Sequence, residues 1–327
     1  MTRAVDTFGR IHRSLRLSVT DRCNLRCQYC MPLEGVPCVP SSGLMTFEEI
    51  VFAVDVAVSL GIDRVRITGG EPLLRHELPT LIEMIRRNTD VVEIAMTTNG
   101  LLLSRRAEEL ADAGLDRINI SLDSLRPDRF RRITRHGLLK TAWAGIEAAA
   151  RAGFSPLRIN TLLLDGFNDD EVDQWLELTR EHTIDVRFME LMPIGEGAEM
   201  TRRGQFLNLT ELRRRLVDEL GLVPVGNPVG NGPARYWRLP GAPGRIGFIT
   251  PLSNPYCDSC SRMRLTSTGQ LRACLAQDDH VDLLASLRAG DRKAVEAGFR
   301  RALRDKPAGH QWRDGATTDA QMSALGG

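Results

Sequence analysis

The sequence lacks the features of a membrane-bound, secreted or strongly basic protein. No apolar run reaches the roughly 18 residues that a membrane-spanning helix needs, and the N-terminal stretch has no apolar signal core. The 327 residues carry 43 Lys and Arg against 42 Asp and Glu, and only 5% are aromatic. Proteins that bind nucleic acid or a membrane surface usually have a larger basic excess. We therefore expect a cytoplasmic chain with no nucleic-acid or membrane partner.

Lysine is scarce, and the cysteines do not form an even set. Lysine occurs only at positions 140, 293 and 306, so almost all of the positive charge is arginine, whose planar fork suits phosphate. The seven cysteines are an odd number, which is unsuited to a closed set of disulfides. In a reducing compartment, clustered thiols more often bind metal or take part in catalysis.

Residues 15–190 alternate between strand and helix signals, and the length predicts about two domains. Repeated strand–helix units imply a parallel α/β sheet with right-handed crossovers, either open or closed into a barrel. Both architectures gather ligands at the carboxyl ends of the strands. The predicted strands are Leu15–Thr20, Arg64–Thr68, Val91–Thr97, Arg117–Ser121, Leu157–Leu164 and Asp185–Leu191; the predicted helices are Thr46–Leu60, His76–Arg87, Ser104–Ala113, Leu139–Ala152 and Asp169–His182.

The pattern changes after Met192. The segments PIGEGAEM and VGNPVGNGPA are typical of Gly/Pro-rich connectors. They are followed by short strands near Tyr236–Leu239 and Arg245–Ile249, a hairpin with its turn at Ser267–Gly269, and polar helices near Val281–Leu287 and Arg292–Arg304. We predict two domains, residues 1–192 and a smaller α+β domain over 193–327.

The first cysteine group is Cys23, Cys27 and Cys30, spaced C-x₃-C-x₂-C directly after the first predicted strand. Soft thiolates select zinc or an iron–sulfur cluster. A structural zinc site needs four protein ligands, and Cys38 is the nearby candidate for the fourth. A 4Fe–4S cluster held by three cysteines instead leaves one iron open to a bound cofactor. The spacing alone leaves both interpretations open.

The second group is Cys257, Cys260 and Cys274, spaced C-x₂-C-x₁₃-C. A zinc ribbon completed by Cys38 or His280 is one interpretation. Between the thiols stand Arg262 and Arg264, two guanidinium groups that project together from a strand-like segment and can grip a polyphosphate. A solvated charged strand is the alternative for these two residues.

Two motifs resemble the radical S-adenosylmethionine (radical SAM) superfamily. One is the first cysteine group with Tyr29 before its last cysteine, and the other is Thr68-Gly69-Gly70-Glu71-Pro72 after the second strand. Two glycines let a ligand approach the backbone, and the Glu71 carboxylate can pair with an ammonium group. The resemblance implies a partial (β/α)6 TIM-like barrel that holds a 4Fe–4S cluster and SAM and generates a radical that abstracts hydrogen from a substrate.

With the second cysteine group and the Gly-Gly terminus added, the chain resembles the GTP 3′,8-cyclase family of molybdenum cofactor biosynthesis. This resemblance implies a lyase that converts GTP to 3′,8-cyclo-7,8-dihydro-GTP, with a second 4Fe–4S cluster on Cys257, Cys260 and Cys274. It also implies a reducing electron donor, delivery to the next enzyme, cyclic pyranopterin monophosphate synthase, and a possible homodimer.

The resemblance further implies site residues. Metal ligands are the two cysteine groups; SAM contacts are Tyr29, Gly70, Ser121 and Met192; GTP contacts are Arg16, Arg66, Thr97, Arg158, Arg262, Met263 and Arg264; catalytic roles fall to Arg262, Arg264, Gly326 and Gly327. Arg158 stands where the family usually has Lys, which keeps the charge but changes the donor geometry. Taken alone, Thr97 and Ser121 would be loop caps, Met192 a core residue and the glycines a disordered tail.

Two other functions compete with this one. A radical SAM enzyme that modifies a peptide would share the first motif and carry additional C-terminal clusters. A non-catalytic scaffold with two zinc ions that binds RNA would use both cysteine groups structurally, but the balanced charge and few aromatics fit it poorly.

Overall fold

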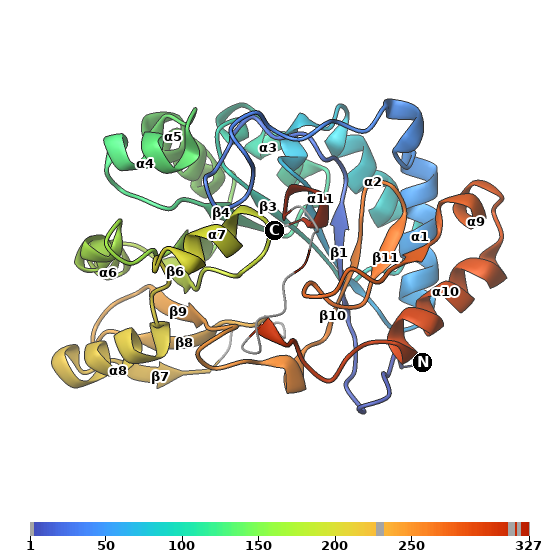
Figure 1. The fold of residues 1–327 in the computed structure, drawn as a ribbon. Coiled ribbons are helices and arrows are strands. Elements are labelled where there is room, and N and C mark those ends of the chain that lie inside the picture. The colour runs from blue at the N-terminus through green and yellow to red at the C-terminus, as the bar shows by residue number, and fades with distance from the viewer. Residues whose placement is uncertain (1–2, 227–231, 313–317, 319–321, 327) are drawn as a thin grey trace.

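The structure, a computed structural model, describes residues 3–226, 232–312, 318 and 322–326. Its central element is one curved sheet of twelve strands in the order β12-β11-β10-β1-β2-β3-β4-β5-β6-β9-β8-β7. Helices cover the outer face of the sheet, and the inner face surrounds a cavity (Figure 1). Among the described residues, no helix is long and apolar enough to cross a membrane.

The middle of the sheet is the predicted parallel α/β array. A crossover connection joins each of the first five strands to the next strand, and the two strands pair in parallel. This arrangement confirms the predicted partial barrel. The strands are β1 (Ser14–Ser18), β2 (Arg64–Thr68), β3 (Glu93–Thr98), β4 (Arg117–Ser121), β5 (Leu157–Leu162) and β6 (Ile184–Met189), and the helices are α1 (Phe47–Ser59), α2 (Leu78–Asn88), α3 (Ala107–Asp112), α4 (Pro127–Thr134), α5 (Leu139–Arg151) and α6 (Val172–Glu181).

The C-terminal part of the chain extends this sheet at both edges. Strand β10 (Arg262–Leu265) pairs in parallel with β1 and continues into β11 (Gln270–Arg272) and β12 (Val281–Asp282). Strand β9 (Arg245–Ile249) pairs in parallel with β6 and continues into β8 (Arg235–Arg238) and β7 (Val223–Val225). One sheet thus runs through both predicted domains, and their boundary after residue 192 stays a prediction.

Some helices of this part differ from the sequence prediction. Helix α7 (Glu196–Arg202) occupies the segment predicted as a connector, and α8 (Leu209–Leu220) has no counterpart in the prediction. Helix α4, in the N-terminal part, has no counterpart either. In the connector, Gly197 serves close packing, because a Cβ there would lie 2.5 Å from the Met192 carbonyl oxygen. The segment predicted as a helix from Val281 begins as β12; α9 (Leu284–Arg288), α10 (Arg292–Arg304) and α11 (Met322–Leu325) follow.

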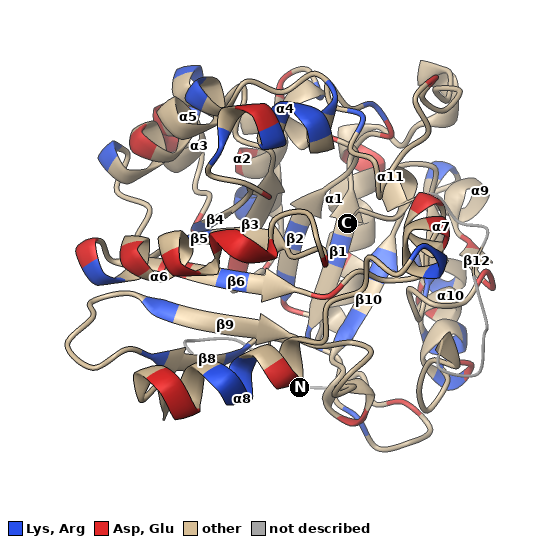
Figure 2. Cartoon of the chain, turned by 60° about the vertical axis from the view of Figure 1, so that its left-hand side comes forward, with Lys and Arg blue, Asp and Glu red and all other residues tan. Residues whose placement is uncertain are grey.

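Side chains along the parallel strands alternate between an apolar and a polar face. Leu15 and Leu17 on β1, and Val65 and Ile67 on β2, are buried in the core beneath the helices. Arg16 and Arg66, between them, line the cavity instead. Period-two alternation is unusual in parallel strands, which are commonly apolar on both faces. The interior of this barrel is therefore a polar site, and basic residues mark several of its strands (Figure 2).

Candidate active site

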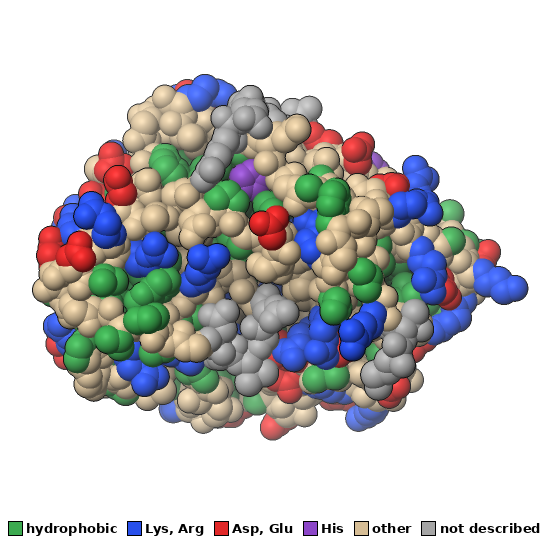
Figure 3. Space-filling view, turned by 90° about the horizontal axis from the view of Figure 1, so that it is seen from below, with side chains coloured by type: hydrophobic (Ala, Val, Ile, Leu, Met, Phe, Trp, Pro, Cys, Tyr) green, Lys and Arg blue, Asp and Glu red, His purple; other side chains and the backbone are tan. Residues whose placement is uncertain are grey.

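A cavity of about 440 Å³ lies inside the curve of the sheet. Viewed from below, this face of the molecule is hollowed near its centre, and Lys and Arg side chains lie beside the hollow (Figure 3). Both cysteine groups and most of the predicted ligand contacts line the cavity: Arg16, Cys23, Cys27, Tyr29, Cys30, Arg66, Gly70, Thr97, Ser121, Arg158, Met192, Cys257, Cys260, Arg262, Arg264 and Cys274.

The first cysteine group occupies the loop that follows β1. The backbone of the loop turns tightly, with the Cys30 N–H donating to the Cys27 carbonyl at 2.9 Å. Burial raises the pKa of Cys23 to about 11 and that of Cys30 to about 12, and it raises the pKa of Cys27 well above its usual range. These thiols therefore stay protonated unless a metal centre stabilises the thiolates.

Two buried carboxyl groups lie near this group. Asp123 accepts the Tyr29 hydroxyl at 2.8 Å and the Leu162 N–H at 2.9 Å, and burial raises its pKa to about 6. Glu71 is 1% exposed, and burial raises its pKa to about 7. The first cysteine group thus sits in the more acidic part of the cavity.

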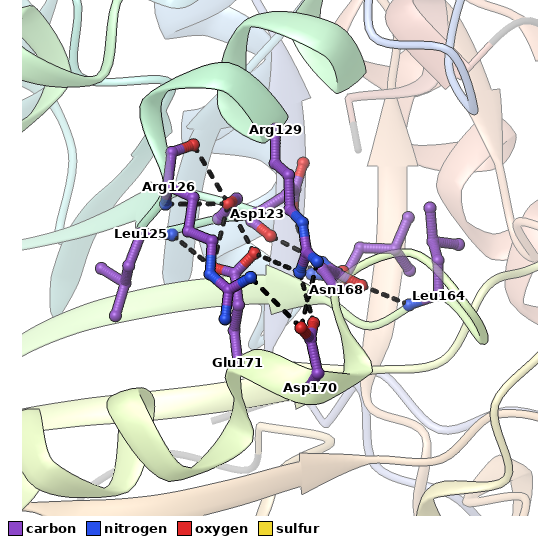
Figure 4. A network of polar contacts seen from close by, with 10 residues as sticks. Asp123, Leu125, Arg126, Arg129, Leu164, Asn168, Asp170 and Glu171 are labelled. Atoms are coloured by element: carbon purple, nitrogen blue, oxygen red, sulfur yellow. Dashed lines mark hydrogen bonds and ion pairs between the residues drawn. The ribbon is translucent and has the colours of Figure 1, made fainter.

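A polar network supports Asp123 from behind (Figure 4). The Asn168 amide donates to the carbonyls of Asp123 at 2.6 Å and Leu162 at 2.8 Å, and its oxygen accepts the Leu164 N–H. Fully buried Glu171 accepts the Leu125 N–H at 2.7 Å and pairs with Arg129 at 3.2 Å. These contacts fix the loop after β4, so Asp123 presents its carboxylate to Tyr29 in one orientation.

The Gly-Gly-Glu segment after β2 packs directly on the loop after β1. A Cβ on Gly69 would lie 2.5 Å from the Thr20 carbonyl oxygen, and one on Gly70 would collide with the Arg22 carbonyl. The Glu71 carboxylate accepts the Leu73 N–H, the Thr98 hydroxyl at 2.7 Å and the Asn99 N–H at 2.8 Å. Glu71 therefore joins the loops after β2 and β3 in addition to lining the cavity.

The second cysteine group lies across the cavity among cations. Cys257 begins a short 3₁₀ turn, Cys260 precedes β10 and Cys274 follows β11. Burial acts to raise the pKa of Cys260, but Arg262 and Lys306 outweigh it and lower the pKa to about 7. The Arg262 guanidinium also lies 4.9 Å from the centre of the Tyr256 ring.

The chemistry of each group fits an iron–sulfur cluster better than one zinc ion. Each group offers three thiols, and a cuboidal cluster binds its cysteines through different irons, so three cysteines leave one iron without a protein ligand. Cys38 is exposed and does not line the cavity, and His280 is exposed, with its ring next to the Asp278 carbonyl. Neither residue supplies the fourth ligand that a zinc site requires.

Three arginines form a row across β10, β1 and β2. The strand register places Arg264 opposite Arg16 and Arg16 opposite Arg66. Burial and the neighbouring guanidinium groups lower the pKa of all three, to about 10 for Arg264, about 9 for Arg66 and well below the usual range for Arg16. Like charges directly opposite on neighbouring strands repel each other. The row is therefore costly in the free protein and suits a multiply charged anion.

Other basic residues of the barrel have acidic neighbours. Glu93 pairs with both Arg64 and Arg117. The Arg158 Nε lies 3.6 Å from Asp185, which already receives two hydrogen bonds from Arg245 at 2.8 and 2.7 Å. Arg158 lines the cavity as predicted, but its charge is partly balanced within the protein.

The sequence prediction omitted several arginines of the cavity wall, namely Arg13, Arg64, Arg117 and Arg187. Arg187 on β6 is 6% exposed, lines the cavity and lowers the pKa of Arg66 through its charge, and its Nε has no hydrogen-bond partner. Its signal was available, since it alternates with the buried residues Val186 and Phe188.

Two predicted residues need separate description. Met263 is fully buried in the hydrophobic core on the opposite face of β10, so the structure does not bring its side chain to the cavity. Gly326 lies inside the barrel: Arg264 Nη1 donates to its carbonyl at 2.6 Å and to that of Leu325 at 2.9 Å. With φ +71°, it packs so closely on Thr68 that no Cβ would fit. Gly327 lies outside the described residues.

Comparison with known proteins agrees with this site. The radical SAM superfamily model matches residues 17–179, and the Molybdenum Cofactor Synthesis C model matches residues 184–312. The chain is 45% identical to the GTP 3′,8-cyclase of Heliobacterium modesticaldum over 99% of this chain and 100% of that protein. It is 44% identical to the GTP 3′,8-cyclases of Pelotomaculum thermopropionicum and Moorella thermoacetica over 98% of this chain and 99% of each relative.

A solved structure supports the fold alone. Streptococcus suis SuiB bound to its precursor peptide SuiA aligns with 91% of this chain and 65% of its own, at 16% identity and a TM-score of 0.63. Full-length similarity to several GTP 3′,8-cyclases decides the assignment: the chain belongs to the GTP 3′,8-cyclase family of the radical SAM superfamily.

Proposed function

We propose that this protein is a GTP 3′,8-cyclase, a lyase that converts GTP to 3′,8-cyclo-7,8-dihydro-GTP for molybdenum cofactor biosynthesis. The observation that best supports this function is that the row Arg264–Arg16–Arg66 lies in the same cavity as the two cysteine groups. A peptide substrate would not require three adjacent guanidinium groups in the wall of one cavity, whereas a triphosphate matches them in charge and donor geometry.

Cys23, Cys27 and Cys30 would hold the 4Fe–4S cluster that membership of the radical SAM superfamily implies, together with SAM. Cys257, Cys260 and Cys274 would hold a second 4Fe–4S cluster, with an iron left open to the guanine. When bound, the first cluster and SAM supply a carbon radical that takes a hydrogen atom from an unactivated C–H bond.

The acidic side of the cavity suits SAM, which carries a sulfonium and an ammonium group. We assign SAM binding to Tyr29, Gly70, Ser121 and Met192, which line the cavity around the first cysteine group. Asp123 holds the Tyr29 hydroxyl, and the missing Cβ of Gly70 lets the loop after β2 lie close to the cysteine loop. These contacts orient the cofactor and keep water from the reacting atoms.

The basic side suits GTP. We assign its triphosphate to Arg16, Arg66, Arg158, Arg262 and Arg264, and further contacts to Thr97 and to the backbone of Met263. Arg262 and Arg264 would act during the reaction because Arg262 lies beside Cys260 and Arg264 contacts the tail that carries Gly326. The substrate's charge would thereby be neutralised before ring formation.

The partners follow from the reaction. A cytoplasmic reducing electron donor would supply electrons, and cyclic pyranopterin monophosphate synthase would take the product. A homodimer is a further possibility that this proposal includes but does not depend on.

Anaerobic reconstitution tests the proposal directly. Purified protein should contain about eight irons per chain, the content of two 4Fe–4S clusters. Incubated with GTP, SAM and a strong reductant, it should release 5′-deoxyadenosine and form a cyclised nucleotide that mass spectrometry detects. Release that is equally fast with ATP or without nucleotide would contradict GTP as the substrate.

A further inference from the structure

One lysine is buried behind the second cysteine group. Lys306, which follows α10, is 4% exposed, whereas Lys140 and Lys293 are exposed. Its ammonium donates to the carbonyl of Arg262 at 2.9 Å and to the carbonyl of Ala273. Arg262 lies two residues after Cys260, and Ala273 directly precedes Cys274. One ammonium group therefore joins the two segments that carry these cysteines.

Arg10 makes the matching connection to the third cysteine. Its Nη1 donates to the Cys257 carbonyl at 3.0 Å and to the Ala308 carbonyl at 2.7 Å, while its Nη2 donates to the Pro307 carbonyl at 2.6 Å. Residues 306–308 thus contact all three cysteine segments, directly or through Arg10. We call Arg10 and Lys306 together the cationic clasp.

The two members of the clasp differ in how their charge is balanced. Asp6 pairs with Arg10 at 2.6 Å. The charges that act on Lys306 include the thiols of Cys260 and Cys274 and the guanidinium groups of Arg10 and Arg262. Within the part of the chain that the structure describes, no carboxylate forms an ion pair with Lys306. A buried ammonium group without a counter-charge is costly. Here the groups available to balance it are the sulfurs of the second cysteine group.

The choice of lysine agrees with this role. The chain uses arginine for almost all of its positive charge, yet it places lysine at this buried position. An ammonium group is a compact point charge whose donors can reach two carbonyls on separate strands, which a planar guanidinium fits less well.

We propose that Lys306 is a positioning residue for the second metal centre: with Arg10 it holds the three cysteine segments in place, and its charge balances the bound thiolates. This inference rests on the proposed function, because it takes the second cysteine group to hold a 4Fe–4S cluster. The inference adds one buried residue, Lys306, that controls both the iron content of the second site and the reduction potential of its cluster.

The test compares Lys306→Met, which removes charge and donors, with Lys293→Met on the exposed face of α10. Both full-length variants are reconstituted anaerobically, and iron, sulfide and the EPR-monitored reduction potentials of the two centres are measured. We expect Lys306→Met to keep the iron and the reduction potential of the first centre. Its second centre should either lose its iron, leaving about four irons per chain, or retain it at a more negative potential. Lys293→Met should match the wild type.

Lys306→Gln separates the two contributions and replaces Lys306→Met should that variant fail to fold. Its amide keeps N–H donors but carries no charge, so its second centre should retain iron and show the lowered potential. If both variants have the iron content and the reduction potentials of the wild type, the proposed role of Lys306 is wrong, while the proposed function still stands. Iron for only one cluster in the wild type would overturn the second cluster itself, and this inference with it.

Discussion

The two cysteine groups look alike in sequence and differ sharply in their surroundings. Burial raises the pKa of Cys23 to about 11, with Glu71 and Asp123 nearby. In the second group, Arg262 and Lys306 outweigh burial and lower the pKa of Cys260 to about 7. The cavity is therefore polarised, with carboxyl groups beside one metal site and cations beside the other.

In the function proposed above, this difference places the two ligands at opposite ends of one cavity. SAM is a cation at its sulfur and amino group and gains from the acidic end, while GTP is a polyanion and gains from the arginine row. The comparison shows that two groups of three thiols have different electrostatic surroundings, set by neighbouring residues that the cysteine motifs do not contain.

The largest expected effect comes from removing a cysteine of the acidic end. Cys27→Ala should abolish SAM cleavage and product formation and remove about half of the iron, because one of the two clusters is lost. Iron analysis and 5′-deoxyadenosine release check it, with exposed Cys38→Ala as the control that should behave as wild type. If SAM cleavage survives unchanged in Cys27→Ala, the assignment of the first group is wrong.

A change in the arginine row should affect the basic end alone. Arg66→Met should weaken GTP binding by about 10- to 100-fold, the loss expected for charge-assisted hydrogen bonds. Because it relieves repulsion within the row, it should leave the melting temperature of the GTP-free protein unchanged or higher. Calorimetric GTP titration and thermal melts measure both.

Arg64→Met is the matched control for that experiment. Arg64 pairs with Glu93 at 3.3 Å, so its removal should lower the melting temperature and affect GTP binding less than Arg66→Met does. A reversed result, with Arg66→Met unstable and binding GTP normally, would make the row a structural feature.

Asp123→Asn should alter the acidic end without disturbing the basic one. The amide offers one oxygen for the two hydrogen bonds that Asp123 accepts from Tyr29 and Leu162. Loss of about 1 kcal/mol would raise the KM for SAM about fivefold, while the affinity for GTP stays constant. Equal effects on both ligands would show that the two ends are not independent. Asp170→Asn, at the exposed end of the same network, is the control.

The smallest effect concerns pH and Glu71. Burial raises the pKa of this carboxyl from 4.5 to about 7 in the folded chain, so the folded state binds the proton more tightly than the unfolded state. Its contribution to the free energy of unfolding therefore falls as pH rises from 4.5 to about 7. Glu71→Gln cannot titrate, so its stability relative to wild type should rise as the pH increases from 4.5 to about 7. Urea unfolding of the reconstituted proteins measures this difference, and exposed Glu77→Gln should show none.

Local patterns in the sequence predicted the fold closely. The bounds of β2 and β4 match the prediction, and Thr46, the predicted start of the first helix, forms a capping box with Glu49 at α1. Both signals depend on residues a few positions apart. Helix α7 was missed because its glycines were taken as helix breakers, whereas Gly197 meets a packing demand from Met192 that only the folded chain shows.

The site residues that belong to local sequence motifs could be predicted, whereas those brought together by the pairing of distant strands could not. The cysteine groups and the Arg262–Arg264 pair are visible in the sequence, but the row that joins Arg264 to Arg16 arises from pairing of strands some 250 residues apart. Lys306 and Asn168 act on distant backbone carbonyls and leave no local pattern. Arg187 could have been found from the alternation of β6.

The pairing of β10 with β1 and of β9 with β6 has a consequence for synthesis of the protein. When the ribosome has completed β6, the nascent barrel has two bare strand edges, which are prone to join other chains. One edge is covered only when residue 262 emerges. The arginine row is completed at the same moment, so a prematurely terminated product that lacks β10 would have neither a covered β1 edge nor the complete row.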